Sequence, residues 1–70
     1  MKYVIVDNVF PIIFSDGMKH SDFIHRGEIT SAGMIKISGD EVHCYGESVS
    51  LKLKPDVTDE LRIKTMLERF

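Results

Sequence analysis

The side chains best suited to covalent chemistry are adjacent in the sequence, at His43 and Cys44. An imidazole that activates a thiolate is the smallest covalent catalytic pair. Neighbouring residues of a strand point to opposite faces of a sheet, however, so His43 is poorly placed to activate Cys44. Val42 has the same parity as Cys44, which predicts a buried thiol that packs as a small apolar side chain.

The other two histidines, His20 and His25, are five positions apart in the sequence. This spacing fits neither the i, i+4 pair of a zinc-binding helix nor a C-x-x-C motif. They could form a metal site only if the fold brought Asp16, Asp22 or His43 to them. We expect surface or helix-end histidines instead, and no metal or other cofactor.

The glycines and serines do not complete a catalytic or phosphate-binding motif either. Gly33, Gly39 and Gly46 do not follow the G-x-G-x-x-G or P-loop pattern, so we interpret them as turn and bulge residues. Ser48 and Ser50 lack the elbow, acid and base of a hydrolase, which predicts solvent-facing hydroxyls. We therefore predict that the protein is not an enzyme.

The 70 residues are 43% hydrophobic and 29% charged, with a formal net charge of −2. This balance is typical of one small globular domain over residues 1–70 and provides no basic footprint for nucleic acid. The single cysteine and the short apolar stretch at 9–14 predict a cytoplasmic protein without a signal peptide or membrane span. A core of this size rarely supplies more than about 3–5 kcal/mol, so we expect further support from a homodimer.

Two β-rich segments at the start of the chain predict a hairpin. Tyr3–Val6 and Val9–Phe14 are β-branched and aromatic, and Asp7 and Asn8 between them tolerate the positive φ angles of a tight turn. Pro11 cannot donate a ladder hydrogen bond. The second strand should therefore lie at a sheet edge, or Pro11 should face away from its partner strand.

A short helix and a second hairpin are expected next. Ser21 can cap a helix over Asp22–Arg26, which Gly27 can end in a left-handed conformation. Ile29–Ile37 and Val42–Tyr45 then have the character of two strands joined by a turn at 38–41.

The stretch from Ser48 to Lys54 alternates between apolar and polar residues, which predicts a strand with Val49, Leu51 and Leu53 buried. The apolar residues of this stretch are odd-numbered, whereas Val42 and Cys44 in the preceding strand are even-numbered. A bulge at Gly46-Glu47 would let one bent strand keep both apolar sets inside. Two separate strands are the alternative, although Gly46-Glu47 leaves little room for a reversal.

The end of the chain predicts an amphipathic helix over Val57–Phe70, capped by Asp56 or Thr58. Its apolar stripe contains Ile63, Met66, Leu67 and Phe70, widened by Leu61. The expected fold class is α+β, with a four-stranded antiparallel sheet in ββαββα order. The C-terminal helix should pack on one face of that sheet.

A sheet with one helix covers only one of its faces, and the chain has more apolar bulk than one helix face needs. We therefore expect an exposed apolar patch that binds a partner. Alternatively, the short helix and the loop at 15–19 cover these residues. The candidate interaction surface consists of Phe10, Phe14, Met18, Met34 and Tyr45.

The second half of the chain resembles short uncharacterised proteins of bacteria and their mobile elements. The resemblance rests on Ser31-Ala32-Gly33, on Tyr45-Gly46-Glu47-Ser48-Val49-Ser50-Leu51 and on the acidic start of the final helix. It implies a bacterial or phage origin and carries no activity, ligand or functional residue.

Three functions from different classes follow from these features. The first is a non-enzymatic module that binds a protein partner and, in a phage or mobile element, inhibits a host factor. The second is a nucleic-acid accessory protein, with Lys36, Lys52 and Lys54 on one sheet face; the eleven acidic residues weigh against it. The third is a small metal or enzyme subunit whose site forms at an interface around the three histidines.

Overall fold

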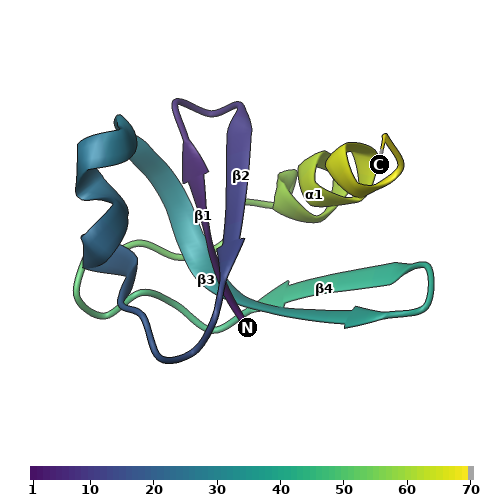
Figure 1. Ribbon diagram of the computed structural model, residues 1–70, viewed down its shortest axis with the longest axis horizontal. Coiled ribbons are helices and arrows are strands. Elements are labelled where there is room, and N and C mark those ends of the chain that lie inside the picture. Colours follow the sequence, from purple (N-terminus) through teal and green to yellow (C-terminus); the bar gives the residue numbers. More distant parts are fainter. Residues whose placement is uncertain (70) are drawn as a thin grey trace.

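The computed structural model describes residues 1–69 and has the predicted α+β architecture. Four antiparallel strands form one sheet in the order β2-β1-β3-β4 (Figure 1). No helix within residues 1–69 has the length and apolar character needed to cross a membrane. The elements are β1 (Lys2–Val6), β2 (Phe10–Phe14), the 3-10 helix η1 (His20–Arg26), β3 (Ile29–Ser38), β4 (Glu41–Tyr45) and α1 (Asp59–Leu67).

Both predicted hairpins are confirmed, with one change at the first turn. Asp7 and Asn8 have φ angles of 54° and 61°, as a tight turn of this kind requires. Val9 belongs to this turn rather than to β2, because its N–H donates to the Val6 carbonyl at 3.0 Å. In the second hairpin, Gly39 with φ 58° helps to close the turn between β3 and β4.

The predicted edge position of Pro11 is confirmed, because β2 is an outer strand of the sheet. The Met1 carbonyl accepts the N–H of Ile35 at 2.9 Å, so odd-numbered residues of β1 direct their backbone groups toward β3. Ile5 therefore directs neither its N–H nor its carbonyl group toward its partner Pro11. The missing N–H of Pro11 costs no hydrogen bond of the ladder.

Both faces of the sheet are covered, and β1 is buried on each of them. Tyr3 and Ile5 pack with Ile63 of α1, while Val4 and Val6 pack with Phe23 of η1. The two helices lie on opposite sides of β1 (Figure 1). The short helix therefore covers the second face, as the alternative expectation had it for Phe14. The α1 face contains Tyr3, Ile5, Ile35, Val42 and Ile63, and the η1 face contains Val4, Val6, Phe14, Phe23 and Ala32.

The short helix begins earlier than predicted and is capped differently. The backbone N–H of Lys19 donates to Asp22 Oδ2 at 2.9 Å, so Lys19 and not Ser21 is the N-cap residue. Gly27 ends the helix as expected, but its φ of 141° and ψ of −161° lie outside the left-handed helical region. Only glycine adopts that conformation without strain.

The prediction of a long strand over 48–54 is wrong. Gly46, with φ 67°, ends β4, and the chain then forms a tight turn in which Ser48 and Leu53 pair across residues 49–52. Ser48 is 1% exposed rather than solvent-facing, and its Oγ accepts the N–H of Leu51 at 3.3 Å. This local bond stabilises the turn instead of a ladder. Val49, expected in the core, is 80% exposed.

The C-terminal helix is confirmed with shorter bounds, Asp59–Leu67, and Phe70 of the predicted stripe lies outside the described residues. Of the two predicted capping residues, Thr58 is the N-cap residue, although its side chain makes no capping hydrogen bond. Asp56 lies just before it: its carboxylate accepts the N–H of Thr58 at 2.9 Å, and its own N–H donates to Asp59 Oδ2 at 2.8 Å. Ile63 is fully buried, whereas Leu61 is 67% exposed and does not widen the buried stripe.

Candidate functional site

The five residues of the expected interaction surface do not lie together. Phe14 is 7% exposed and belongs to the core, where its ring contacts those of His20 and Phe23. Phe10 is 62% exposed and pairs with Val6, at the opposite end of β1 from the others.

Met18, Met34 and Tyr45 gather near Lys2 and form what we call the Lys2-end patch. Lys2 pairs with Met34, which in turn pairs with Tyr45, and the Lys2 ammonium donates to the Met18 carbonyl at 3.0 Å. Met18 and Tyr45 are exposed, and Met34 is half-buried. Of the five residues of the predicted surface, only Met18, Met34 and Tyr45 therefore lie close together on the surface.

The histidines and the cysteine lie in separate environments. His20 is buried, and its Nε2 donates to the Gly33 carbonyl at 2.9 Å, while the exposed His43 has Nε2 3.2 Å from Glu41 Oε2. Cys44 packs beside the α1-face core with Val42, as the parity argument predicted, but it is half-buried rather than buried. Over residues 1–69, His, Cys, Asp and Glu side chains form no group of three that could hold a metal ion.

Two other expectations about side-chain placement are wrong. Lys52 lies in the 49–52 turn and Lys54 outside any strand, so neither shares a sheet face with Lys36. Gly33 is not a turn or bulge residue, because it lies buried within β3. A Cβ atom there would lie 2.8 Å from Pro55 Cγ and from the Tyr45 carbonyl oxygen, so glycine permits a close approach of the chain.

A groove between the β1–β2 turn and α1 exposes several apolar side chains. We call it the hairpin–helix groove, and its volume is about 550 Å³. Val9, Phe10 and Leu61 are 58%, 62% and 67% exposed within it. It is lined by Asn8, Val9, Phe10 and Pro11 from the hairpin and by Leu61, Arg62, Thr65, Met66 and Arg69 from the helical side.

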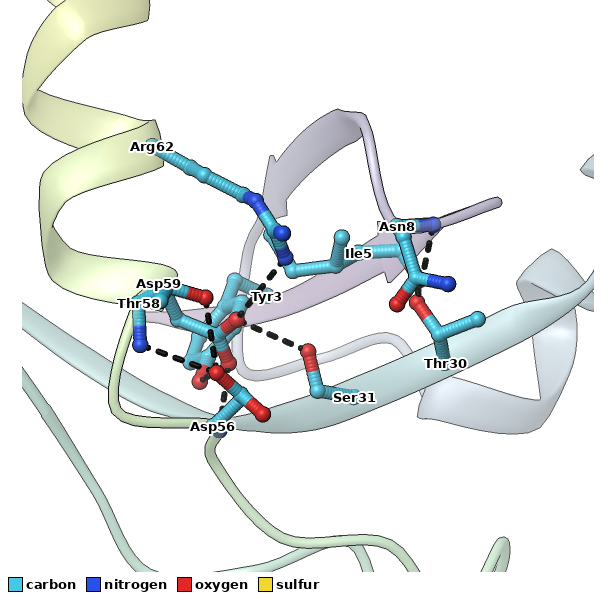
Figure 2. A network of polar contacts seen from close by, with 9 residues as sticks. All are labelled: Tyr3, Ile5, Asn8, Thr30, Ser31, Asp56, Thr58, Asp59 and Arg62. Carbon is cyan, nitrogen blue, oxygen red and sulfur yellow. Dashed lines mark hydrogen bonds and ion pairs between the residues drawn. The ribbon is translucent and has the colours of Figure 1, made fainter.

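The helical wall of the groove is fixed by a buried polar network around Asp59 (Figure 2). Asp59 is fully buried, and its Oδ2 accepts the Tyr3 hydroxyl at 2.7 Å while its Oδ1 accepts the Ser31 hydroxyl at 2.9 Å. Arg62 Nη1 lies 4.0 Å from Oδ1. The negative charge also lies at the N-terminus of α1, where the helix dipole favours it.

The hairpin wall is tied to the start of β3 by a second set of polar contacts (Figure 2). The N–H of Asn8 donates to Thr30 Oγ1 at 3.0 Å, and that hydroxyl donates to the Ile5 carbonyl at 3.2 Å. Asp7 and Glu28 also exchange backbone and carboxylate hydrogen bonds. Both walls are therefore held by specific hydrogen bonds before any ligand binds.

Burial shifts the pKa values of two side chains in and beside this network. Burial, followed by the hydrogen bond to Asp59, raises the pKa of Tyr3 well above its usual range. Burial likewise raises the pKa of Cys44 from 9.0 to about 11. Tyr3 and Asp59 are both 0% exposed, so no substrate can reach them in this conformation.

Both edges of the sheet resist the addition of a further strand. Pro11 directs its backbone away from β1, so the free edge of β2 lacks an N–H donor at that position. On the other edge, Glu60 Oε2 already accepts the N–H of Cys44 at 2.9 Å. Each edge therefore lacks one free main-chain donor for a further strand.

The sequence contained one signal for the groove that the stripe interpretation overlooked. An α-helix turns about 100° per residue, so Leu61 lies roughly 160° around the axis from Ile63. A residue so placed cannot share the buried side with Ile63. The apposition of Leu61 and Phe10, in contrast, depends on tertiary packing.

Comparisons with protein-family models, with curated proteins and with solved structures find no match to this chain. The resemblance to short bacterial and mobile-element proteins therefore stays a prediction.

Proposed function

We propose that the protein is an interaction module whose hairpin–helix groove binds an apolar segment of a partner protein. The observation that carries the proposal is the exposure of Val9, Phe10 and Leu61 on two walls that hydrogen bonds hold apart. Exposed apolar side chains that gather in one place commonly mark a partner surface. In a phage or other mobile element, such a module could inhibit a host factor.

A second copy of the chain is a poorer occupant of this groove than a different protein. In a two-fold dimer the same surface meets itself. Among the residues of 1–69 that line the groove, Arg62 and Arg69 are charged and none is acidic, so a two-fold contact would bring like charges together. A homodimer, if it forms, should use another surface.

The test is a selection of twelve-residue peptides from a random display library on the folded chain. Counter-selection on Leu61→Glu removes peptides that bind elsewhere, because this exposed position accepts a charge without unfolding the domain. Selected peptides are synthesised, titrated into the ¹⁵N-labelled chain and mapped by amide shifts. Tyr45→Ser is the matched control, since it alters the Lys2-end patch instead.

We expect saturable binding that shifts the amides of Val9, Phe10 and residues 61–69, survives Tyr45→Ser and is lost in Leu61→Glu. Binding that Tyr45→Ser abolishes and Leu61→Glu preserves would contradict the proposal and favour the Lys2-end patch. A chain that light scattering shows to be a dimer, and that Leu61→Glu converts to a monomer, would also contradict it, because the groove would then bind a second copy.

A further inference from the structure

Building on the proposed function, we infer that the segment bound in the hairpin–helix groove is an amphipathic helix with carboxylates beside its apolar side chains. The charged side chains that line the groove are Arg62 and Arg69, within a chain of net charge −2. The groove is thus a local positive site on an acidic protein. Charge complementarity of this kind selects partners and steers their approach.

The spacing of the two arginines defines what the partner should carry. Arg62 and Arg69 are seven positions apart, which places them on the same side of the helical chain about 10 Å apart along the axis. The Arg69 N–H bonds to the Met66 carbonyl at 3.2 Å and keeps the chain coiled beyond the end of α1. Two carboxylates seven positions apart on a partner helix match this separation.

The two arginines should contribute unequally. Arg62 Nη1 lies 4.0 Å from the buried carboxylate of Asp59, so part of its charge is already balanced. Arg69 is exposed and lacks such a partner among the ion pairs of residues 1–69. We therefore expect Arg69 to be the stronger contact for a carboxylate, with Arg62 helping to orient it.

A helix fits the groove better than an extended strand does. The hairpin contributes the side chains of Val9, Phe10 and Pro11 to the lining, and Pro11 leaves the adjacent edge without a full set of donors. Strand addition depends on main-chain hydrogen bonds, whereas a helix in a groove is held by apolar anchors at i, i+3, i+4 and i+7. The hairpin–helix groove provides apolar side chains that can contact the anchors of such a helix.

The experiment uses three synthetic helical peptides with the same four leucines at i, i+3, i+4 and i+7. They differ only in two flanking positions seven residues apart, which are both Glu, both Gln or both Lys. Each peptide is titrated into the wild-type chain, Arg69→Glu and Lys64→Glu by calorimetry at low and high salt. Lys64→Glu makes the same charge change on the other side of α1, where Lys64 lies with Ile37 and Leu67.

We expect the Glu peptide to bind about tenfold more tightly than the Lys peptide, and to lose about tenfold in affinity in Arg69→Glu but not in Lys64→Glu. High salt should reduce the difference between the peptides. Equal binding of all three peptides, abolished by Leu61→Glu, would overturn this inference and leave the proposed function standing. If no peptide binds and the library selection also yields none, both fail together.

Discussion

The first turn of α1 and the side of the same helix that faces β2 are built in opposite ways. The first turn buries Asp59 completely and satisfies it with hydroxyl, amide and guanidinium groups from three parts of the chain. Two residues further on, Leu61 leaves most of its apolar side chain in water. The carboxylate of Asp59 is therefore buried, whereas the large apolar side chain of Leu61 is exposed to solvent.

This inversion shows how one short helix can serve two purposes. Burial of a carboxylate costs free energy unless every oxygen is paired, so the Asp59 network fixes one specific position for α1. A fixed helix then holds Leu61 and Met66 opposite Phe10 without contributing them to the core. A preorganised groove of this kind loses little conformational entropy when a ligand binds.

The largest expected effect comes from removing the buried carboxylate. Asp59→Ala leaves the Tyr3 hydroxyl, the Ser31 hydroxyl and the N–H of Asp56 without their acceptor. Breaking a buried charged network costs about 3–5 kcal/mol, which is comparable with the whole stability of a domain this small. Urea unfolding followed by circular dichroism should therefore show no folded baseline.

Glu68→Ala is the control for Asp59→Ala, because Glu68 is an exposed acidic residue just beyond the same helix. It should change the free energy of unfolding by less than about 0.5 kcal/mol. If Asp59→Ala keeps more than half of the wild-type stability, the network does not fix α1.

A smaller loss is expected when one member of the network is removed and its packing is kept. Tyr3→Phe deletes the hydroxyl that donates to Asp59 Oδ2, although that oxygen still accepts the N–H of Asp56. The cost should be about 1–2 kcal/mol in urea unfolding. Tyr45→Phe removes a hydroxyl from a 51% exposed ring and should have no measurable effect. Equal losses in the two variants would contradict the assignment.

A pH-dependent loss of stability should appear at high pH, with Cys44 kept reduced. The folded state raises the pKa of Cys44 from 9.0 to about 11, so between these values the folded chain retains a proton that the unfolded chain has lost. The free energy of unfolding must then fall as pH rises from about 9 to about 11. In Cys44→Ala this decline should be shallower in urea titrations at a series of pH values. Parallel declines in the two proteins would show that the thiol is not stabilised in its neutral form.

Local sequence patterns predicted both hairpins, the edge position of Pro11 and Thr58 as one of two candidate N-cap residues, because each depends on neighbouring residues. The Asp59 network was not predictable in this way. Its hydrogen bonds join Asp59 to Tyr3 and Ser31, which are 56 and 28 positions away in the sequence. At Asp59 the sequence shows only an acidic residue near the start of the final helix, and this cannot distinguish an exposed carboxylate from a buried one.

The errors at Ser48 and Leu61 have a different physical origin. The alternation over 48–54 matches the period of a strand, but the Ser48 hydroxyl accepts a backbone N–H three residues on and favours a turn. Leu61 resembles the buried stripe in being apolar, but its angle around the helix places it on another side. Periodicity indicates which residues can lie on one face of an element. It does not indicate which of them pack against another element.

The smallest expected change in stability is the one that separates the groove from the core. Leu61 and Ile63 are apolar residues two positions apart on α1, and they are 67% and 0% exposed. Ile63→Ala should cost about 2–5 kcal/mol through lost burial and a cavity, whereas Leu61→Ala should stay within about 0.5 kcal/mol. Urea unfolding measures both, and peptide titration should show that Leu61→Ala loses affinity for groove ligands while remaining folded. A loss of stability in Leu61→Ala as large as that in Ile63→Ala would place the groove side of α1 in the core and remove the basis for a binding surface there.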